Sequence, residues 1–431
     1  MRTWALGVTI VLSACFGIPD QKPDRPNAPE ANDPAFASNG LKAWYLIADG
    51  AQRGEDQMTF TITAPEDADV VDAYIPGLPP VRMTKQGEHT FSMDVSIASL
   101  AVGSYDLLFS ANASDDAFAK FTFNRSAAYY VLVSTDYDFS DCGNGSLQYM
   151  DRLHMDHPGM VITHFWAPYT YTDPAVTAER RDELDVWIKT QRDMFHDEIG
   201  LHIHPYCTFV VAAGLTCITD QSVVYASDTS GYTIKLAAYG MQSMSTLLQK
   251  AAAIFNERGL GTPKTFRAGA WTADINVLQA LDANGYVADT SALNWARIEE
   301  WARTELYNWT KTNWSTIGDT SQPYYPSESD PQATTPGANL AMLEVPDNGV
   351  MIDYVSLVEM NAIFDANFDG TPFANPKTLM MGFHPAMQFT EDEYSRVNGF
   401  LKYADEHLAS KGTGPVVYIT LSDVTKAFPV P

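Results

Sequence analysis

The sequence predicts an α/β fold in which a (β/α) barrel follows a small all-β sandwich. Between residues 41 and 126, short runs alternate apolar and polar residues, which is the period-two pattern of half-buried antiparallel strands. From residue 127 onward, continuous apolar runs alternate with helical stretches, as is typical of parallel strands buried on both faces. The chain has 431 residues, which is long enough for two domains.

The predicted sandwich contains the alternating runs Met58–Thr63, Thr90–Val95 and Tyr105–Phe109, separated by Gly, Pro and Asp turns. This spacing favours a small Ig-like antiparallel sandwich over residues 41–126. No cluster of catalytic residue types lies in this region. We expect it to act as a spacer, or as a surface that binds glycan or protein.

Eight apolar runs in the region 127–431 are strand candidates. They are Tyr129–Ser134, Met160–Phe165, Ile199–His204, Lys264–Arg267, Tyr286–Asp289, Ala341–Val345, Leu379–His384 and Val416–Thr420. Amphipathic helices are expected between several of them, including Ala178–Phe195 and Met241–Glu257. Seven or eight such units favour a closed barrel over a doubly wound sheet. The irregular stretch 300–340 is expected to form a loop over one mouth of this barrel.

The N-terminus carries a predicted export signal. Arg2 supplies a positive charge, Trp4–Leu12 form an apolar run too short to span a bilayer, and the run ends in Leu12-Ser13-Ala14-Cys15. This ending resembles the bacterial lipobox, which implies a signal peptide over 1–15, diacylation of Cys15 and a membrane-anchored lipoprotein on the periplasmic or cell-surface side. The alternative is a plain signal peptide in which Cys15 occurs by chance. The Pro-rich residues 16–40 are expected to form a flexible tether.

Charge excludes one class of partner. Lys and Arg number 27 against 53 Asp and Glu, which gives a net charge of -26, whereas phosphate binding needs clustered cations. We therefore expect no nucleic-acid partner.

Polar residues gather at the carboxyl ends of the predicted barrel strands, the face where barrel active sites are built. The residues at these ends are Asp136, Asp138, His202, His204, Arg267, Trp271, Asp289 and His384. His202 and His204 alternate on a strand and therefore point to the same face. Two imidazoles and a carboxylate are a common ligand set for one divalent metal, zinc above all. A second carboxylate is a suitable general base, another His a general acid, and an Arg a means of keeping the base ionised.

These motifs resemble the polysaccharide deacetylase family, the NodB-homology domain or carbohydrate esterase family 4, over residues 128–431. The resemblance implies a distorted (β/α) barrel that removes acetyl groups from glycans with a divalent metal. It implies that Asp136 is the catalytic base, and that Asp138, His202 and His204 bind the metal. The chain departs from the family where one residue separates the two acids and where the two His lie only two positions apart.

The same resemblance assigns five further roles. Arg267 would hold the base, and Asp289 would brace Arg267. His384 would be the catalytic acid, the Tyr206 backbone N–H an oxyanion donor, and Trp271 a wall of the acetyl pocket.

Two smaller predictions concern cysteine and histidine. Cys207 and Cys217 are the most plausible disulfide pair in an exported protein, and Cys142–Cys207 is the competing arrangement. His154 and His157 precede Pro158 and are expected at a solvated helix end rather than at a metal site.

The expected function is metal-dependent removal of acetyl groups from an extracellular or cell-wall glycan, with N-deacetylation favoured. Two alternatives stay open. One is an O-acetyl esterase or a non-sugar amidase on the same barrel, and the other is an inactive glycan-binding lipoprotein. Serine hydrolysis is not expected, because the chain has no Gly-x-Ser-x-Gly elbow.

Overall fold

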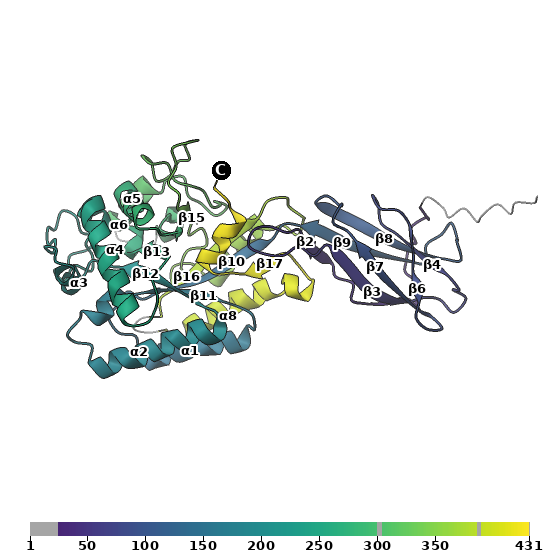
Figure 1. The fold of residues 1–431 in the computed structure, drawn as a ribbon, viewed down its shortest axis with the longest axis horizontal. Helices are drawn as coiled ribbons and strands as arrows, with labels where there is room; N and C mark the ends of the chain where they lie inside the picture. The colour runs from purple at the N-terminus through teal and green to yellow at the C-terminus, as the bar shows by residue number, and fades with distance from the viewer. Residues whose placement is uncertain (1–24, 300–303, 386–388, 431) are drawn as a thin grey trace, which may run out of the picture. The chain divides into compact units, whose positions relative to one another are not determined.

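The computed structural model describes residues 25–299, 304–385 and 389–430, in two compact units (Figure 1). The first unit comprises the described residues up to Leu41, with Gln57–Leu100 and Tyr105–Phe123. The second comprises Lys42–Asp56, Ala101–Ser104 and the chain from Asn124 onward. Cys15 and the rest of the predicted signal segment lie outside the described residues. No helix within the described residues is both long and apolar enough to cross a bilayer.

The first unit is built from two antiparallel sheets. Its strands are β1 (Ala37–Asn39), β3 (Gln57–Thr63), β4 (Val71–Tyr74), β5 (Val81–Arg82), β6 (Thr84–Lys85), β7 (Thr90–Ser96), β8 (Gly103–Ala111) and β9 (Ala119–Ser126). One sheet has the order β1-β3-β7-β6, and the other contains β9-β8-β4-β5. On β3 the alternate residues Met58, Phe60 and Ile62 are buried. Phe60 meets Phe109 of the other sheet edge to face, so the apolar faces of the two sheets pack together.

Part of the expected tether belongs to this first unit. β1 pairs with β3, and the Asn27 N–H donates to the Asp115 carbonyl at 2.7 Å. An edge strand offers unpaired backbone groups, and this Pro-rich segment supplies partners for them. Over the described residues 27–39 the chain is therefore folded into the first unit, and not the flexible tether that the sequence predicted.

A second difference concerns the segment Lys42–Asp56, which was expected in the sandwich but lies in the second unit. Its strand β2 (Trp44–Leu46) pairs in parallel with Asn124–Ser126. Trp44 is buried and meets Phe368 edge to face at 5.5 Å. Burial of this aromatic residue stabilises the packing of the segment on the core of the second unit, although the segment precedes the sandwich strands in the chain.

The second unit is an α/β domain with one curled parallel sheet. Its strands are β10 (Tyr129–Asp136), β11 (Ile162–Trp166), β12 (Glu198–Ile203), β13 (Thr265–Ala268), β14 (Ala288–Asp289), β15 (Leu343–Glu344), β16 (Lys377–Phe383) and β17 (Val416–Tyr418). The order is β15-β14-β13-β12-β11-β10-β16, and β17 also pairs with β10. Its helices are α1 (Asn144–Asp156), α2 (Ala178–Thr190), α3 (Cys207–Ala212), α4 (Gly240–Glu257), α5 (Ile275–Ala283), α6 (Thr304–Asn313), α7 (Leu357–Asn367), α8 (Glu391–Asp405) and α9 (Leu421–Val424). The distorted barrel predicted from the sequence is confirmed.

The distortion lies between β15 and β16, which do not pair within the described residues. A loop bridges the gap instead. The Asn348 side chain accepts from the Met380 N–H at 3.0 Å and donates to the Thr378 carbonyl at 3.1 Å. The Gly349 N–H donates to the Met380 carbonyl at 3.0 Å, and a Cβ on Gly349 would lie 2.2 Å from that oxygen. Only glycine therefore fits where this loop closes the barrel.

Candidate metal centre and active site

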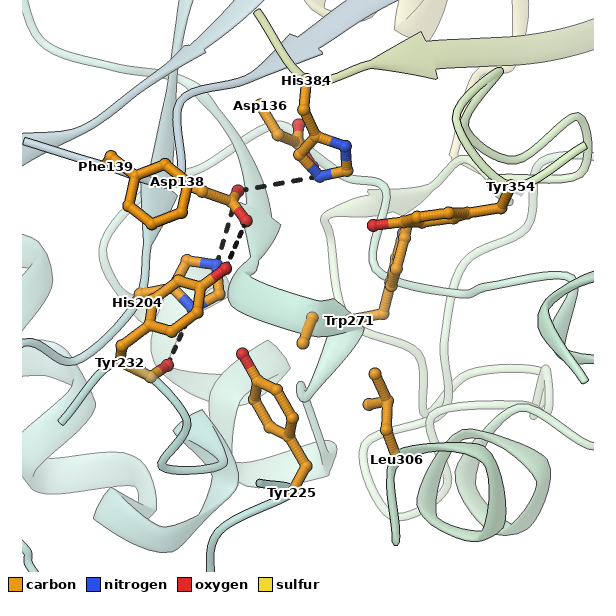
Figure 2. Close-up of a pocket in the computed structure, with 11 residues that line it drawn as sticks. Asp136, Asp138, Phe139, His204, Tyr225, Tyr232, Trp271, Leu306, Tyr354 and His384 are labelled. Carbon is orange, nitrogen blue, oxygen red and sulfur yellow. Dashed lines mark hydrogen bonds and ion pairs between the residues drawn. The ribbon is translucent and has the colours of Figure 1, made fainter. Parts of the chain in front are cut away.

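Four of the residues predicted at the strand ends, Asp136, Asp138, His204 and His384, converge on one face of the barrel (Figure 2). Asp136 is the last residue of β10, and Asp138 follows it by two positions. His202 lies in β12 with His204 directly after that strand, and His384 directly follows β16. Because these strands run parallel in one sheet, their carboxyl ends lie at the same edge. Asp136, Asp138, His204 and His384 line one cavity of about 140 Å³.

Asp138, His202 and His204 have the geometry of a metal-ligand set. Asp138 Oδ1 lies 3.1 Å from His202 Nε2 and 3.5 Å from His204 Nε2. The Nδ1 atoms are each 2.9 Å from a backbone carbonyl, of Arg267 for His202 and of Tyr232 for His204. Hydrogen bonds of this kind fix the tautomer and leave Nε2 free to bind a cation.

A divalent metal fits this donor set. His204 Nε2 is buried and has no hydrogen-bond partner, and the three ligand atoms lie within 4.8 Å of one another. An unpartnered polar atom at such a position is costly unless something binds it. Burial opposes ionisation of Asp138, but His384, His204 and His202 outweigh it and hold the pKa of this carboxyl well below its usual range. Asp136, Asp138 and His384 form a second such group.

Tyr232 supports the metal ligands and was not foreseen from the sequence. Its hydroxyl donates to Asp138 Oδ2 at 2.8 Å, and its ring stacks on His204 at 4.3 Å. Gly231 precedes it with φ +93°, and a Cβ there would lie 2.4 Å from the Pro205 carbonyl oxygen. In the sequence, only the pair Gly231-Tyr232 could have indicated that this loop lies against Pro205. The surrounding residues show no periodic pattern.

The close approach of Gly269 to His204 also constrains the site. A Cβ on Gly269 would lie 2.7 Å from the His204 ring, so any side chain there would displace this ligand. This explains the glycine in the motif Phe266-Arg-Ala-Gly-Ala-Trp271.

Arg267 contacts Asp136, as the resemblance implied. Its Nη1 atom donates to Asp136 Oδ1 at 2.9 Å and to Ser134 Oγ at 3.0 Å. Arg267 is fully buried in β13. Burial opposes its charge, but the neighbouring Asp136 and Asp347 carboxylates outweigh burial and raise the pKa of the guanidinium. The permanent positive charge holds Asp136 in place.

The acid that braces Arg267 is Asp347 rather than Asp289. Asp347 Oδ2 lies 3.5 Å from Arg267 Nη2 and accepts from Trp271 Nε1 at 2.8 Å. Asp289 instead accepts from the Ser291 hydroxyl at 2.9 Å and lies in register with Glu344 of β15. Burial and the neighbouring Asp289 carboxylate raise the pKa of Glu344 well above its usual range. The role predicted for Asp289 is wrong because Asp289, at the end of β14, lies beside Glu344 of the neighbouring strand β15.

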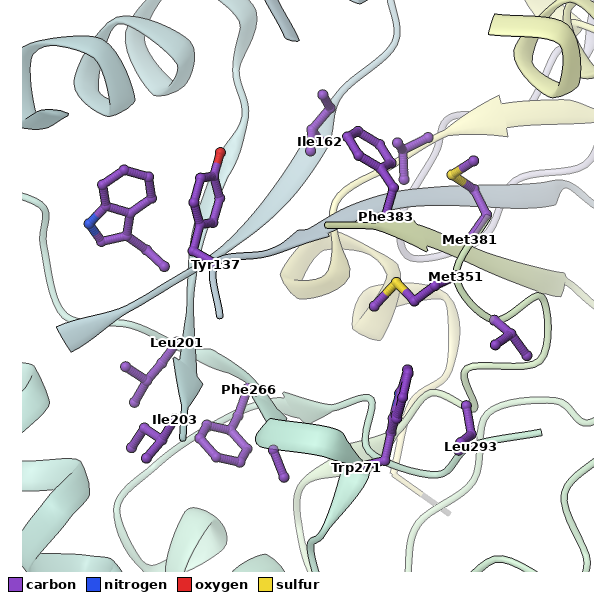
Figure 3. Packing of buried hydrophobic residues seen from close by; sticks show 14 of the residues in the cluster. Tyr137, Ile162, Leu201, Ile203, Phe266, Trp271, Leu293, Met351, Met381 and Phe383 are labelled. Atoms are coloured by element: carbon purple, nitrogen blue, oxygen red, sulfur yellow. The ribbon is translucent and has the colours of Figure 1, made fainter. Parts of the chain in front are cut away.

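Trp271 lines the cavity from a strained turn. Ala270 and Trp271 have φ values of +50° and +53°, a left-handed conformation that costs residues with a side chain about 1–3 kcal/mol each. The Trp271 carbonyl accepts from Trp314 Nε1 at 3.1 Å. Figure 3 shows Trp271 in the apolar core beside Leu293. The core thus holds the indole in place at the edge of the cavity.

His384 is supported by Asp353, a residue without a predicted role. Asp353 Oδ2 accepts from the His384 backbone N–H at 3.0 Å and lies 2.9 Å from His384 Nδ1. Burial lowers the pKa of His384, but the Asp138 and Asp353 carboxylates outweigh burial and raise it to about 10. The contacts with Asp353 orient the ring of the predicted general acid.

The structure contradicts the predicted role of the Tyr206 N–H as an oxyanion donor. The Tyr206 N–H donates to the His204 carbonyl at 2.7 Å, because the chain turns tightly at Pro205. It is therefore engaged inside the turn. The hydroxyls of Tyr225 and Tyr354 point into the cavity instead (Figure 2).

The remaining predictions concern cysteines and histidines. Cys207 and Cys217 form a disulfide, while Cys142 is free and buried. His154 and His157 are buried, which corrects the solvated helix end. His154 Nε2 lies 2.8 Å from Asp197, and His157 Nδ1 lies 3.0 Å from Asp405. These histidines can be buried because each contacts the carboxylate of an aspartate that is distant in the sequence.

Comparison with solved structures finds similar folds in proteins of low sequence identity. A protein classed as a polysaccharide deacetylase from Mycobacterium smegmatis is 12% identical, over 69% of this chain and 89% of its own, with a TM-score of 0.40. A family 4 carbohydrate esterase from Streptomyces lividans, in complex with acetate, is 11% identical over 70% and 96%, with a TM-score of 0.35. Puue allantoinase is 11% identical over 70% and 90%, with a TM-score of 0.38. No protein-family model and no curated protein matches the chain. Similarity at this level assigns no activity.

Proposed function

We propose that the chain is a divergent polysaccharide deacetylase that uses one divalent metal, zinc above all, to remove acetyl groups from a glycan. The observation that carries this proposal is the convergence of Asp138 with His202 and His204, flanked by Asp136 and His384. N-deacetylation is favoured over ester hydrolysis, because the supported His384 is well placed to protonate an amine leaving group.

The residues divide the chemistry among themselves. A metal held by Asp138, His202 and His204 would supply Lewis acidity toward a water and a carbonyl. Asp136, oriented by Arg267, takes the proton of the attacking water. His384 gives a proton to the departing amine or alcohol, and Asp353 orients its ring. Trp271 forms one wall against which the acetyl group packs.

The alternatives have different support. The same groups would hydrolyse an O-acetyl ester or a non-sugar amide, so the substrate must be tested directly. An inactive glycan-binding protein is disfavoured, because the ligand set, the oriented Asp136 and the supported His384 are all in place.

The metal and the activity are tested together. We expect the purified protein to hold about one metal ion per chain, measured by elemental mass spectrometry, since the set has three protein ligands as in catalytic zinc sites. We expect it to release acetate from at least one of chitooligosaccharides, peptidoglycan and acetylxylan. His202→Ala should lose both the metal and acetate release, and His89→Ala, in the first unit, should keep both. A wild-type protein without metal would contradict the proposal, as would a fully active His202→Ala variant.

The location is a separate proposal, supported by the sequence Leu12-Ser-Ala-Cys15 after a short apolar run. We infer that Cys15 carries acyl chains that anchor the exported protein to a membrane. Each buried methylene contributes about 0.8 kcal/mol, so several chains hold a protein firmly. Expressed in a bacterial host, the full-length protein should partition into a detergent phase, and Cys15→Ala should move it to the aqueous phase. Equal partitioning of both forms would exclude the lipid anchor.

A further inference from the structure

The proposed reaction places negative charge on one oxygen of the substrate. When water adds to the acetyl carbon, a C–O bond forms and one electron pair of the C=O bond moves to the carbonyl oxygen. Asp136 takes the proton of the water. The electron pair returns when the C–N bond breaks, and His384 protonates the departing nitrogen. Fixed hydrogen-bond donors beside such an oxygen are usually among the largest contributions to the rate of acyl transfer.

The donor must be a group that the fold leaves available to the substrate. The Tyr206 N–H is engaged with the His204 carbonyl. Two other donors that line the cavity serve the site itself. The Tyr232 hydroxyl donates to Asp138 Oδ2 at 2.8 Å, and Trp271 Nε1 donates to Asp347 at 2.8 Å. The tyrosine hydroxyls that point into the cavity are those of Tyr225 and Tyr354 (Figure 2).

These two hydroxyls approach the cavity from different sides. The ring of Tyr354 lies 5.7 Å from the ring of His384, so it stands on the side where the departing nitrogen is protonated. The hydroxyl of Tyr225 points instead toward the side of His204 and Tyr232 (Figure 2). The carbonyl oxygen and the nitrogen leave the acetyl carbon in different directions. With the nitrogen toward His384, the oxygen can therefore face Tyr225.

The backbone holds Tyr225 in a fixed position. Its N–H donates to the Thr233 carbonyl at 3.0 Å, within a hairpin formed by residues 223–235. The side chain of Tyr225 is buried. Directly after the hairpin, the Ala237 N–H donates to the Thr272 carbonyl at 3.0 Å, which ties the hairpin to the turn that carries Trp271. A donor held in this way needs no reorganisation when the charge develops.

We propose that Tyr225 is a catalytic residue whose hydroxyl donates to the acetyl carbonyl oxygen as that oxygen becomes negatively charged. This inference rests on the proposed deacetylase function. A tyrosine hydroxyl is protonated at neutral pH and can therefore donate. Tyr225 thus takes, from a loop, the role that the sequence assigned to the Tyr206 N–H.

Kinetics give the first test. Tyr225→Phe removes one oxygen atom and keeps the ring, so kcat for acetate release should fall by about 10²–10³-fold, the usual cost of one oxyanion donor. KM should stay within about threefold of the wild type, because the charge arises only in the transition state. Metal content should stay at the wild-type level. Tyr403→Phe is the matched control, since its hydroxyl on α8 donates to Asp365 at 2.6 Å outside the cavity.

Binding of methylphosphonate gives a second test that needs no turnover. This anion is tetrahedral and carries negatively charged oxygens, like the acetyl group after water has added. Calorimetry on the metal-loaded protein should show binding to the wild type and to Tyr403→Phe with equal affinity. Tyr225→Phe should bind about 10–100-fold more weakly, the usual effect of losing one hydrogen bond to a charged group.

The outcomes separate this inference from the function on which it rests. In Tyr225→Phe, a kcat within about twofold of the wild type or an unchanged affinity for methylphosphonate would overturn the role of Tyr225 and leave the deacetylase standing. Loss of the metal would also overturn it, because Tyr225 would then support the ligands rather than the substrate. If the wild type releases no acetate, the deacetylase proposal fails. Weaker methylphosphonate binding in Tyr225→Phe would then still support the donor, and a wild type that does not bind methylphosphonate would overturn it.

Discussion

Replacing Asp136 by asparagine should lower kcat for acetate release by about 10²–10⁴-fold, the usual contribution of a general base. Asparagine keeps the size of the side chain and leaves an oxygen to accept from Arg267 Nη1, which lies 2.9 Å from Asp136 Oδ1 in the wild type. It cannot take the proton of the attacking water. Single-turnover acetate release, measured with saturating substrate, separates this chemical step from binding.

Metal content is the control for this variant. Asp138, His202 and His204 are untouched in Asp136→Asn, so the metal should stay at the wild-type level. Asp220→Asn, a change on an exposed loop, should leave the rate unaltered. A rate within twofold of the wild type would exclude Asp136 as the base. Loss of the metal would instead place Asp136 among the ligands, in the second group that it forms with Asp138 and His384.

The barrel was predictable because buried parallel strands leave a strong signal in the sequence. Runs such as Tyr129–Ser134 and Leu379–His384 became β10 and β16 with small shifts at their ends. The gap between β15 and β16 was not predictable. It is closed by single hydrogen bonds of Asn348 and by the close approach of Gly349, which leave no periodic pattern.

The residues of the site also divide into those that the strand pattern predicts and those that it does not. Asp136, His202 and Arg267 lie in strands whose ends must meet, so the strand pattern alone predicts their convergence. Tyr232, Asp347 and Asp353 support these groups from loops, and only the folded chain brings them close. The two corrected roles, of Asp289 and the Tyr206 N–H, came from the family resemblance rather than from strand geometry.

Arg267→Met should destabilise the second unit by about 3–5 kcal/mol, the usual cost of removing one partner of a buried ion pair. Methionine fills similar space, so the loss would come from charge. Arg267 lies 2.9 Å from Asp136 and 3.5 Å from Asp347, and all three residues are buried. Without the guanidinium, two buried carboxylates face each other with no cation between them.

Urea unfolding followed by tryptophan fluorescence measures this loss in the correct unit, because Trp44, Trp166, Trp271 and Trp314 all belong to the second unit. Arg192→Met is the matched control. Its ion pair with Asp193 is partly exposed and should cost only about 0–1 kcal/mol. The further change Asp347→Asn in the Arg267→Met background should recover part of the stability, because it removes one of the stranded charges. A loss below about 1 kcal/mol in Arg267→Met would contradict the expectation that the two buried carboxylates depend on Arg267 for the stability of the second unit.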